Sequence, residues 1–270
     1  MRTQQQKAAA FRALHERPGA FIIPNPWDAG SARILAGLGF EALATTSLGV
    51  ANMLGRPVTR EDVIDNCRVI CAATDLPVNA DLENCFADQP RAAAQVIGQA
   101  AEAGVVGASI EDYTNDRAKP LYDFSLAVER VQAAAEVAHA QPAPVMLTAR
   151  AEGGIRGRPD IDGILRRLQA FERAGADVLY APGSWDLATI RLMTSAVTKP
   201  VNVVTGFLDP DITAAQLAEA GAKRVSVGGA LSRLALAAFL RGARELRNGG
   251  IGWQREMLTG AELKSLFGGA

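Results

Sequence analysis

Short apolar segments alternate with longer amphipathic segments along most of the chain. The apolar segments hold four to six residues, rich in Val, Ile, Leu and Ala. Such runs are typical of buried parallel strands, whereas the segments between them repeat apolar residues at helical spacing. We expect strands at residues 20–24, 42–46, 77–80, 105–110, 144–149, 177–180, 200–204 and 224–227. We expect helices at 3–16, 31–38, 59–74, 90–103, 125–140, 160–174, 186–197, 213–220 and 231–248.

Eight strands that alternate with helices in 270 residues predict an α/β fold. This number of units favours a single (β/α)8 barrel of the TIM type, with an additional N-terminal helix, over an open doubly wound sheet. No Gly-x-Gly-x-x-Gly motif follows the first strand, which weakens a dinucleotide-binding alternative. We therefore expect residues 1–250 to form one catalytic barrel domain.

Residues 251–270 form a tail with apolar residues that include Trp253, Met257, Leu263 and Phe267. An exposed helical tail with this many apolar side chains is a liability for a protein in water. We expect it to pack on its own barrel or on a neighbouring subunit, and the pattern alone favours neither.

The charge balance excludes several classes of partner. The chain has 28 basic and 29 acidic residues and a net charge of -1, which offers no field for nucleic acid or an anionic membrane. No apolar run is long enough to span a bilayer, and the polar N-terminus does not resemble a signal peptide. We expect no nucleic acid and no membrane among the partners.

The cysteines and histidines narrow the possible chemistry. Cys67, Cys71 and Cys85 form no Cys-x-x-Cys pair, so we expect free thiols and a cytoplasmic location. The two histidines, His15 and His139, lie in Ala-rich helical segments, which argues against a histidine zinc site or a Ser-His-Asp triad.

Two carboxylates follow the third expected strand. Asp81 and Glu83 are two residues apart, so an extended backbone points both side chains the same way. Two such carboxylates repel each other unless a cation or a shared proton lies between them. The alternative is a solvated loop, because Asp and Asn favour such positions.

Polar residues also follow most of the other strands, where (β/α)8 barrels carry their active sites. The strand ends hold Asn25, Trp27, Asp28, Thr45, Thr46, Ser47, Asn79, Asp81, Glu83, Glu111, Asp112, Arg150, Glu152 and Asn202. A carboxylate cluster without histidine suits a hard cation such as Mg2+, with Mn2+ as an alternative.

Arg150 and the backbone at 46–49 supply groups that bind anions. A guanidinium can hold a substrate carboxylate in two-pronged fashion, and backbone N–H groups can hold a second oxyanion. With a metal, these groups can stabilise the enolate of a small 2-oxo acid. Two alternatives remain: Glu111 and Arg150 form only a buried ion pair, and Trp27 and Asp28 only begin a helix, with Asp28 or Ser31 as its cap.

Several segments together resemble the isocitrate lyase/phosphoenolpyruvate mutase superfamily. They are Asn-Pro-Trp-Asp-Ala-Gly-Ser-Ala at 25–32, Thr-Thr-Ser at 45–47, Ala-Asp-Leu-Glu at 80–83, Ser-Ile-Glu-Asp at 109–112 and Leu-Thr-Ala-Arg at 147–150. The resemblance implies a (β/α)8 barrel, an Mg2+-held enolate, and cleavage or formation of a C–C or P–C bond beside a 2-oxo acid. It also implies a homo-tetramer, a dimer of dimers, in which a C-terminal helix is exchanged between subunits.

The resemblance also implies roles for individual residues. Catalytic roles fall to Arg150, Glu111 and Asp81. The resemblance places Asp81 and Glu111 around the metal, and Arg150, Thr46, Ser47 and Leu48 around the substrate. The polar strand ends add Glu83 and Asn79 as candidate metal ligands, and Trp27 and Asn202 as candidate substrate-binding residues.

The chain departs from the superfamily pattern at three places. Asn79 stands where members often have Asp, and an acid usual near Val58 is missing. The lyases carry a Lys-Lys/Arg-Cys-Gly-His segment after the fourth strand, whereas residues 113–120 contain neither Cys nor His. We expect this run to form a lid, with contacts from Tyr113, Asn115 or Lys119.

These observations predict an enzyme, a Mg2+-dependent carbon–carbon lyase that acts on a small 2-oxo or 2-hydroxy dicarboxylic acid. The alternatives with the same enolate chemistry are a phosphoenolpyruvate mutase, a P–C hydrolase and a 2-oxo-acid decarboxylase. A further alternative, suggested by Asn79 and Val58, is a catalytically impaired protein that binds 2-oxo acids.

Overall fold

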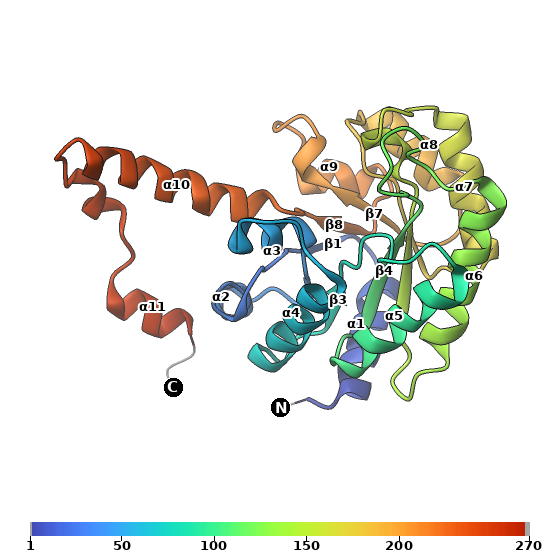
Figure 1. The fold of residues 1–270 in the computed structure, drawn as a ribbon, viewed down its shortest axis with the longest axis horizontal. Coiled ribbons are helices and arrows are strands. Elements are labelled where there is room, and N and C mark those ends of the chain that lie inside the picture. Colours follow the sequence, from blue (N-terminus) through green and yellow to red (C-terminus); the bar gives the residue numbers. More distant parts are fainter. Residues whose placement is uncertain (1, 268–270) are drawn as a thin grey trace.

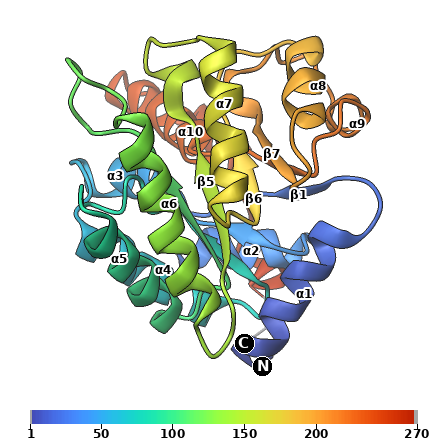
Figure 2. The same ribbon diagram turned by 90° about the vertical axis from the view of Figure 1, so that its right-hand side faces the viewer.

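Eight parallel strands form one sheet that curves into a nearly closed barrel with helices outside it (Figures 1 and 2). The computed structural model describes residues 2–267. The strands are β1 (Phe21–Ile23), β2 (Leu43–Ala44), β3 (Val78–Ala80), β4 (Gly107–Glu111), β5 (Met146–Arg150), β6 (Val178–Tyr180), β7 (Val201–Val204) and β8 (Arg224–Ser226). Their order in the sheet is β1-β8-β7-β6-β5-β4-β3-β2. The (β/α)8 prediction is confirmed.

The gap between β1 and β2 is bridged next to the strands. Ala44 N donates to Pro24 O at 3.0 Å, and the Asn25 amide donates to Thr45 O at 2.9 Å. The side-chain oxygen of Asn25 also accepts from the backbone N–H groups of Val227 and Gly228, just after β8. Asn25 therefore ties three strand ends together at the carboxyl end of the barrel.

The helices match the expected pattern, including one in the predicted C-terminal tail, with one addition. They are α1 (Gln4–Glu16), α2 (Ala29–Gly37), α3 (Ser47–Leu54), α4 (Arg60–Ala73), α5 (Pro90–Glu102), α6 (Phe124–His139), α7 (Ile161–Arg173), α8 (Leu187–Ser195), α9 (Ala214–Glu219), α10 (Ala230–Arg247) and α11 (Gly260–Leu266). The sequence pattern does not predict α3 as a helix, although Thr46 caps its start and Gly55 ends it in the left-handed conformation. Its apolar residues lie on more than one side, with Val50 buried and Leu48, Met53 and Leu54 exposed, so the segment lacks the one-sided pattern that predicts a helix.

Two apolar clusters hold the barrel together. One lies between the strands and the outer helices. The other fills the amino-terminal end of the barrel, where Phe11 and Leu14 of α1 pack with Phe21, Ile23 and Met146. Helix α1 thus closes the end of the barrel opposite the polar strand ends.

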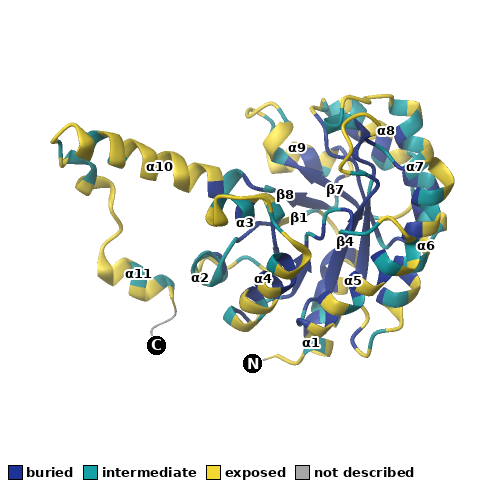
Figure 3. Cartoon of the chain, in the orientation of Figure 1, coloured by how far each residue is buried: buried dark blue, intermediate teal, exposed yellow. Residues whose placement is uncertain are grey.

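Helix α10 leaves the barrel rather than covering it (Figures 1 and 3). Its Phe239 side chain is 73% exposed, and Leu234, Leu236 and Leu240 are exposed as well. After the short 3-10 helix Gly252–Glu256, α11 returns toward α2, where Leu266 O lies close to Gly37. The apolar face of α10 is therefore uncovered within one chain, and an exchange between subunits stays a prediction.

The cysteine prediction is confirmed, since Cys67, Cys71 and Cys85 are all free thiols. Among residues 2–267, no helix has the length and apolar character that crossing a bilayer requires. The cytoplasmic location stays a prediction.

His15 of α1 is a buried neutral residue. Its Nδ1 lies 2.8 Å from Phe11 O and must donate to it, and its ring meets those of Phe11 and Phe21 edge to face. Burial, with the Arg224 cation beside it, lowers the pKa of His15 from 6.5 to about 3. The unfolded chain binds this proton near pH 6.5, so the unfolded state takes it up first as the pH falls.

We therefore expect His15 to make the fold sensitive to acid. Lowering the pH from 7 to 5 should cost the folded state about 2 kcal/mol through this residue. Denaturant unfolding at both pH values should show that His15→Gln loses less stability between them than the wild type does. His139→Gln, the control at the exposed histidine that pairs with Asp177, should keep the wild-type loss. An unchanged loss in His15→Gln would contradict the assignment.

Candidate active site

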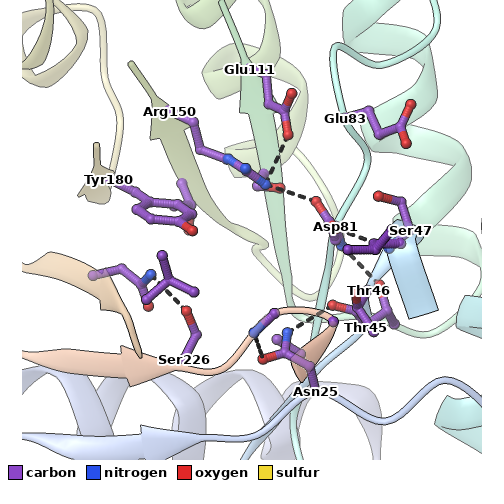
Figure 4. A pocket seen from close by; sticks show the side chains of 18 of the residues that line it. Asn25, Thr45, Thr46, Ser47, Asp81, Glu83, Glu111, Arg150, Tyr180 and Ser226 are labelled. Carbon is purple, nitrogen blue, oxygen red and sulfur yellow. Dashed lines mark hydrogen bonds and ion pairs between the residues drawn. The ribbon is translucent and has the colours of Figure 1, made fainter. Parts of the chain in front are cut away.

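The guanidinium of Arg150 lies at the centre of the barrel mouth (Figure 4). Its Nη1 lies 2.9 Å from Asp81 Oδ1 and 2.9 Å from Glu111 Oε1. Its Nε and Nη2 lie 2.9 Å and 2.8 Å from Glu152 Oε1. Its other face lies over the Tyr180 ring at 4.7 Å. Charged side chains at or just after the ends of β3, β4 and β5 thus converge on one point.

The mouth has more negative than positive charge. Asp81, Glu83, Glu111 and Glu152 face two cations, Arg150 and Arg156, and Arg156 Nη2 lies 3.2 Å from Glu152 Oε2. With all six groups ionised, two negative charges remain. Burial and the neighbouring acids raise the pKa of Glu111 well above its usual value, against the opposing effect of Arg150. Burial and the nearby Asp81 likewise raise the pKa of Glu83.

Helix α3 begins at the mouth and places backbone N–H groups there. Ser47 N donates to Asp81 Oδ2 at 3.0 Å, and Gly49 N donates to the capping Thr46 hydroxyl at 3.2 Å. The N–H of Leu48, between them, has no partner among residues 2–267. It is therefore the donor of this turn that is left for an oxyanion.

The loop after β3 holds Glu83 in an uncommon conformation. Glu83, Cys85 and Phe86 have φ values of 51°, 59° and 50°, in the left-handed region that L residues avoid. Arg130 of α6 is fully buried behind the loop and donates to the carbonyl oxygens of Asn84, Ala87 and Asp88. Its donors compensate for the strain and fix the direction of the Glu83 side chain.

The structure brings most of the predicted residues to one cavity of about 450 Å3. Asn79, Asp81, Glu83, Glu111, Arg150, Thr46, Ser47, Leu48 and Asn202 all line it. Trp27 does not line this cavity. Its Cβ packs beside Gly49, where an added Cβ would lie only 3.0 Å away. Asp28 caps α2 together with Ser31, which confirms the structural alternative for this segment.

The asparagines of the lining differ in what they leave open. Asn202 is fully engaged, because Nδ2 donates to Ser226 Oγ at 3.0 Å and Oδ1 accepts from Arg224 Nε at 2.8 Å. Asn79 donates to Ala80 O, but its buried Oδ1 has no partner in the described chain. This oxygen lies beside Gly107 of β4, since a Cβ added there would come within 2.6 Å of both Asn79 Oδ1 and Phe11. It therefore faces the amino-terminal side of the barrel, and a role of Asn79 in metal binding stays a prediction.

The loop after β4 covers one side of the mouth. The Tyr113 ring stacks under the Arg156 guanidinium at 3.7 Å, and Tyr113 pairs with Leu121 across the base of the loop. Tyr113 and Asn115 line the cavity. Lys119 points elsewhere, to Asp123 at 2.9 Å.

Sequence reasoning missed several lining residues inside the barrel. Tyr180, Arg224, Thr148 and Ser109 all line the cavity below the mouth. A signal was present, because each is a polar or aromatic residue at an inward position of a strand that is otherwise apolar.

The residues of the mouth fit a hydrated divalent cation. A divalent cation would hold Glu83 and Glu111 in their ionised forms and would compensate the two negative charges that then remain. Among residues 2–267, no three His, Cys, Asp or Glu side chains converge as a ligand set. Mg2+ in proteins keeps several waters and takes one or two carboxylates together with substrate oxygens. The carboxylates that line the cavity at its mouth are those of Asp81, Glu83 and Glu111.

Comparison with known proteins agrees with the geometry. The family model of phosphoenolpyruvate phosphomutase matches residues 11–247. A protein of Burkholderia cenocepacia, described provisionally as a lyase/mutase, is 51% identical with a TM-score of 0.95, over 98% of this chain and 96% of that one. An uncharacterised protein of Mycobacterium tuberculosis is 31% identical over 89% of this chain and 90% of its own length.

The structure of 2,3-dimethylmalate lyase, a member of the PEP mutase/isocitrate lyase superfamily, is 26% identical with a TM-score of 0.86, over 99% of this chain and 96% of that one. The predicted resemblance is therefore confirmed. The chain belongs to the phosphoenolpyruvate phosphomutase family, within the isocitrate lyase/phosphoenolpyruvate mutase superfamily, and is an enzyme of the lyase type.

Proposed function

We propose that this enzyme is a Mg2+-dependent carbon–carbon lyase that acts on a small 2-oxo or 2-hydroxy dicarboxylic acid through an enolate. The main support for this proposal is the excess negative charge of the mouth. It lies beside two groups that bind anions, Arg150 and the free N–H of Leu48. These are a cation site and two oxyanion donors in one cavity. The likeness to 2,3-dimethylmalate lyase supports a dicarboxylate as the substrate.

The residues of this chain bind and orient the substrate. Leu48 N–H and Arg150 hold the carboxylate beside the reacting carbon, for which Arg150 must share donors that now serve Asp81, Glu111 and Glu152. The loop at Tyr113 limits access of water. A divalent cation bound at Asp81 and Glu111, with Glu83 near it, would polarise the 2-oxo group and stabilise the enolate.

The protonation of the enolate distinguishes this enzyme from lyases that use a cysteine. The cavity lining, as residues 2–267 form it, contains no Cys and no His. The proton therefore comes from water, a tyrosine or a carboxyl group that does not hold the cation, and burial raises the pKa of Glu83, which lies near the cation site. Decarboxylation of a 2-oxo dicarboxylate is a second candidate, because loss of CO2 breaks the C–C bond without a base that removes a hydroxyl proton. The enolate that remains then takes its proton from the same sources.

Removal of metal tests the proposal. The chelated enzyme should lose turnover on a panel of 2-oxo and 2-hydroxy dicarboxylates, and Mg2+ or Mn2+ should restore it. Asp81→Ala and Glu111→Ala should each lower kcat/KM about 10- to 100-fold. Asp65→Ala, at an exposed acid of α4, is the matched control and should retain wild-type activity.

The products identify the reaction. Two organic fragments indicate a lyase, CO2 a decarboxylase and inorganic phosphate from phosphonopyruvate a P–C hydrolase. Full turnover in the chelated enzyme would contradict the metal assignment. Binding of the panel without turnover of any member would favour the binding-protein alternative.

The exposed face of α10 supports a homo-tetramer with exchanged C-terminal helices. We expect light scattering to give a mass four times that of the 28.4 kDa chain. Phe239→Glu should lower this mass, because it places a charge in the apolar contact. Val69→Glu, at an exposed apolar residue of α4, should not change it. A wild-type monomer would exclude the exchange.

A further inference from the structure

One buried cation in the cavity has no acid beside it. Arg224 of β8 is 3% exposed, and within residues 2–267 no carboxylate lies within ion-pair distance of it. Its Nε donates to Asn202 Oδ1 at 2.8 Å and its Nη2 to Thr148 Oγ1 at 3.1 Å. Its Nη1 lies 3.5 Å from Nε2 of the neutral His15. Every partner is uncharged.

This arrangement is costly in a folded protein, because a buried charge normally has an opposite charge next to it. Burial lowers the pKa of Arg224 to about 9, so the group still carries its charge at neutral pH. Arg130 is also buried among neutral oxygens, but it lies outside the cavity lining and holds a loop. Arg224 lines the cavity, so a ligand can reach it.

One hydroxyl group contacts the guanidinium, and a second lies on the neighbouring strand. Thr148 accepts from Arg224, and Ser109 is its register partner on the neighbouring strand β4. The Ser109 hydroxyl is buried and has no hydrogen-bond partner in the described chain. Strands β8, β5 and β4 therefore present one cation and two hydroxyl groups in the interior of the barrel, below the acidic mouth.

The two ends of the cavity have opposite charge. The mouth has an excess of carboxylate, and its Arg150 is occupied by three of them. The interior end has a cation without a counterion. A ligand with an anionic group at each end fits this arrangement, with one group at the mouth and the other at Arg224.

We propose that Arg224, with the hydroxyl groups of Thr148 and Ser109, binds the second carboxylate of a dicarboxylic substrate. The inference rests on the proposed function for the orientation of the substrate and deepens it by naming the group that selects dicarboxylates. Arg224 is then a specificity residue, and it is neutralised only when the substrate is bound.

Matched ligand pairs test this assignment. 2-Oxoglutarate and 2-oxovalerate share a five-carbon 2-oxo-acid skeleton, and malate and 2-hydroxybutyrate share a four-carbon one; each pair differs in the second carboxylate. Calorimetry with Mg2+ present should show the dicarboxylate of at least one pair binding about tenfold tighter or more. Arg224→Met should remove this preference and leave binding of the monocarboxylate unchanged.

Ser109→Ala gives a second variant that retains the fold, because it removes a hydroxyl group that has no protein partner. It should reduce the preference for the dicarboxylate about three- to tenfold. Arg91→Met, at an exposed arginine of α5, is the control and should keep the wild-type preference. Circular dichroism and thermal unfolding show whether each variant is folded.

The outcomes separate this inference from the proposed function. Metal-dependent turnover together with a dicarboxylate preference that survives in both folded variants would overturn the role of Arg224 and leave the lyase proposal intact. A preference that both variants lose, in a protein that turns over no substrate, would support Arg224 and overturn the lyase proposal. If folded Arg224→Met lost affinity equally for both ligands of a pair, the inference would also be overturned, since that result indicates a structural role.

Discussion

The guanidinium of Arg150 organises the barrel mouth. It collects three carboxylates from the ends of β3, β4 and the segment after β5, and these groups would repel one another without it. The same ion pairs connect to the start of α3, because Asp81 also accepts from Ser47 N. A change in the charge of the mouth therefore alters the positions of both the acids and the backbone donors at the start of α3.

The rest of the fold keeps this cluster buried and in register. Helix α1 fills the amino-terminal end of the barrel, Asn25 joins the ends of β1, β2 and β8, and Arg130 fixes the loop that carries Glu83. Low exposure strengthens each electrostatic interaction of the site, and it also raises the cost of leaving a charge without a partner. The cavity shows both effects, since the ion pairs at its mouth are strengthened and the charge of Arg224 at its other end has no partner.

The sequence predicts the barrel well, because each strand is a short apolar run and each strand end carries polar residues. It places Asp81, Glu111 and Arg150 together because the carboxyl ends of parallel strands meet at one edge. It does not predict α3, whose start depends on the contact of Ser47 with Asp81, 34 residues away. It also does not reveal the role of Arg224. Whether this arginine has an acid partner depends on the residues that other strands bring near it, and no single segment of the sequence shows them.

Calorimetric titration with oxalate, a planar mimic of an enolate, tests the central claim most directly. The charge excess at the mouth predicts that oxalate binds with Mg2+ present and does not bind after chelation. Arg150→Ala should abolish the binding seen with Mg2+, because it removes a donor to the ligand and leaves Asp81, Glu111 and Glu152 without their shared cation. Oxalate binding of equal strength with and without the metal, or no binding in either condition, would contradict the account.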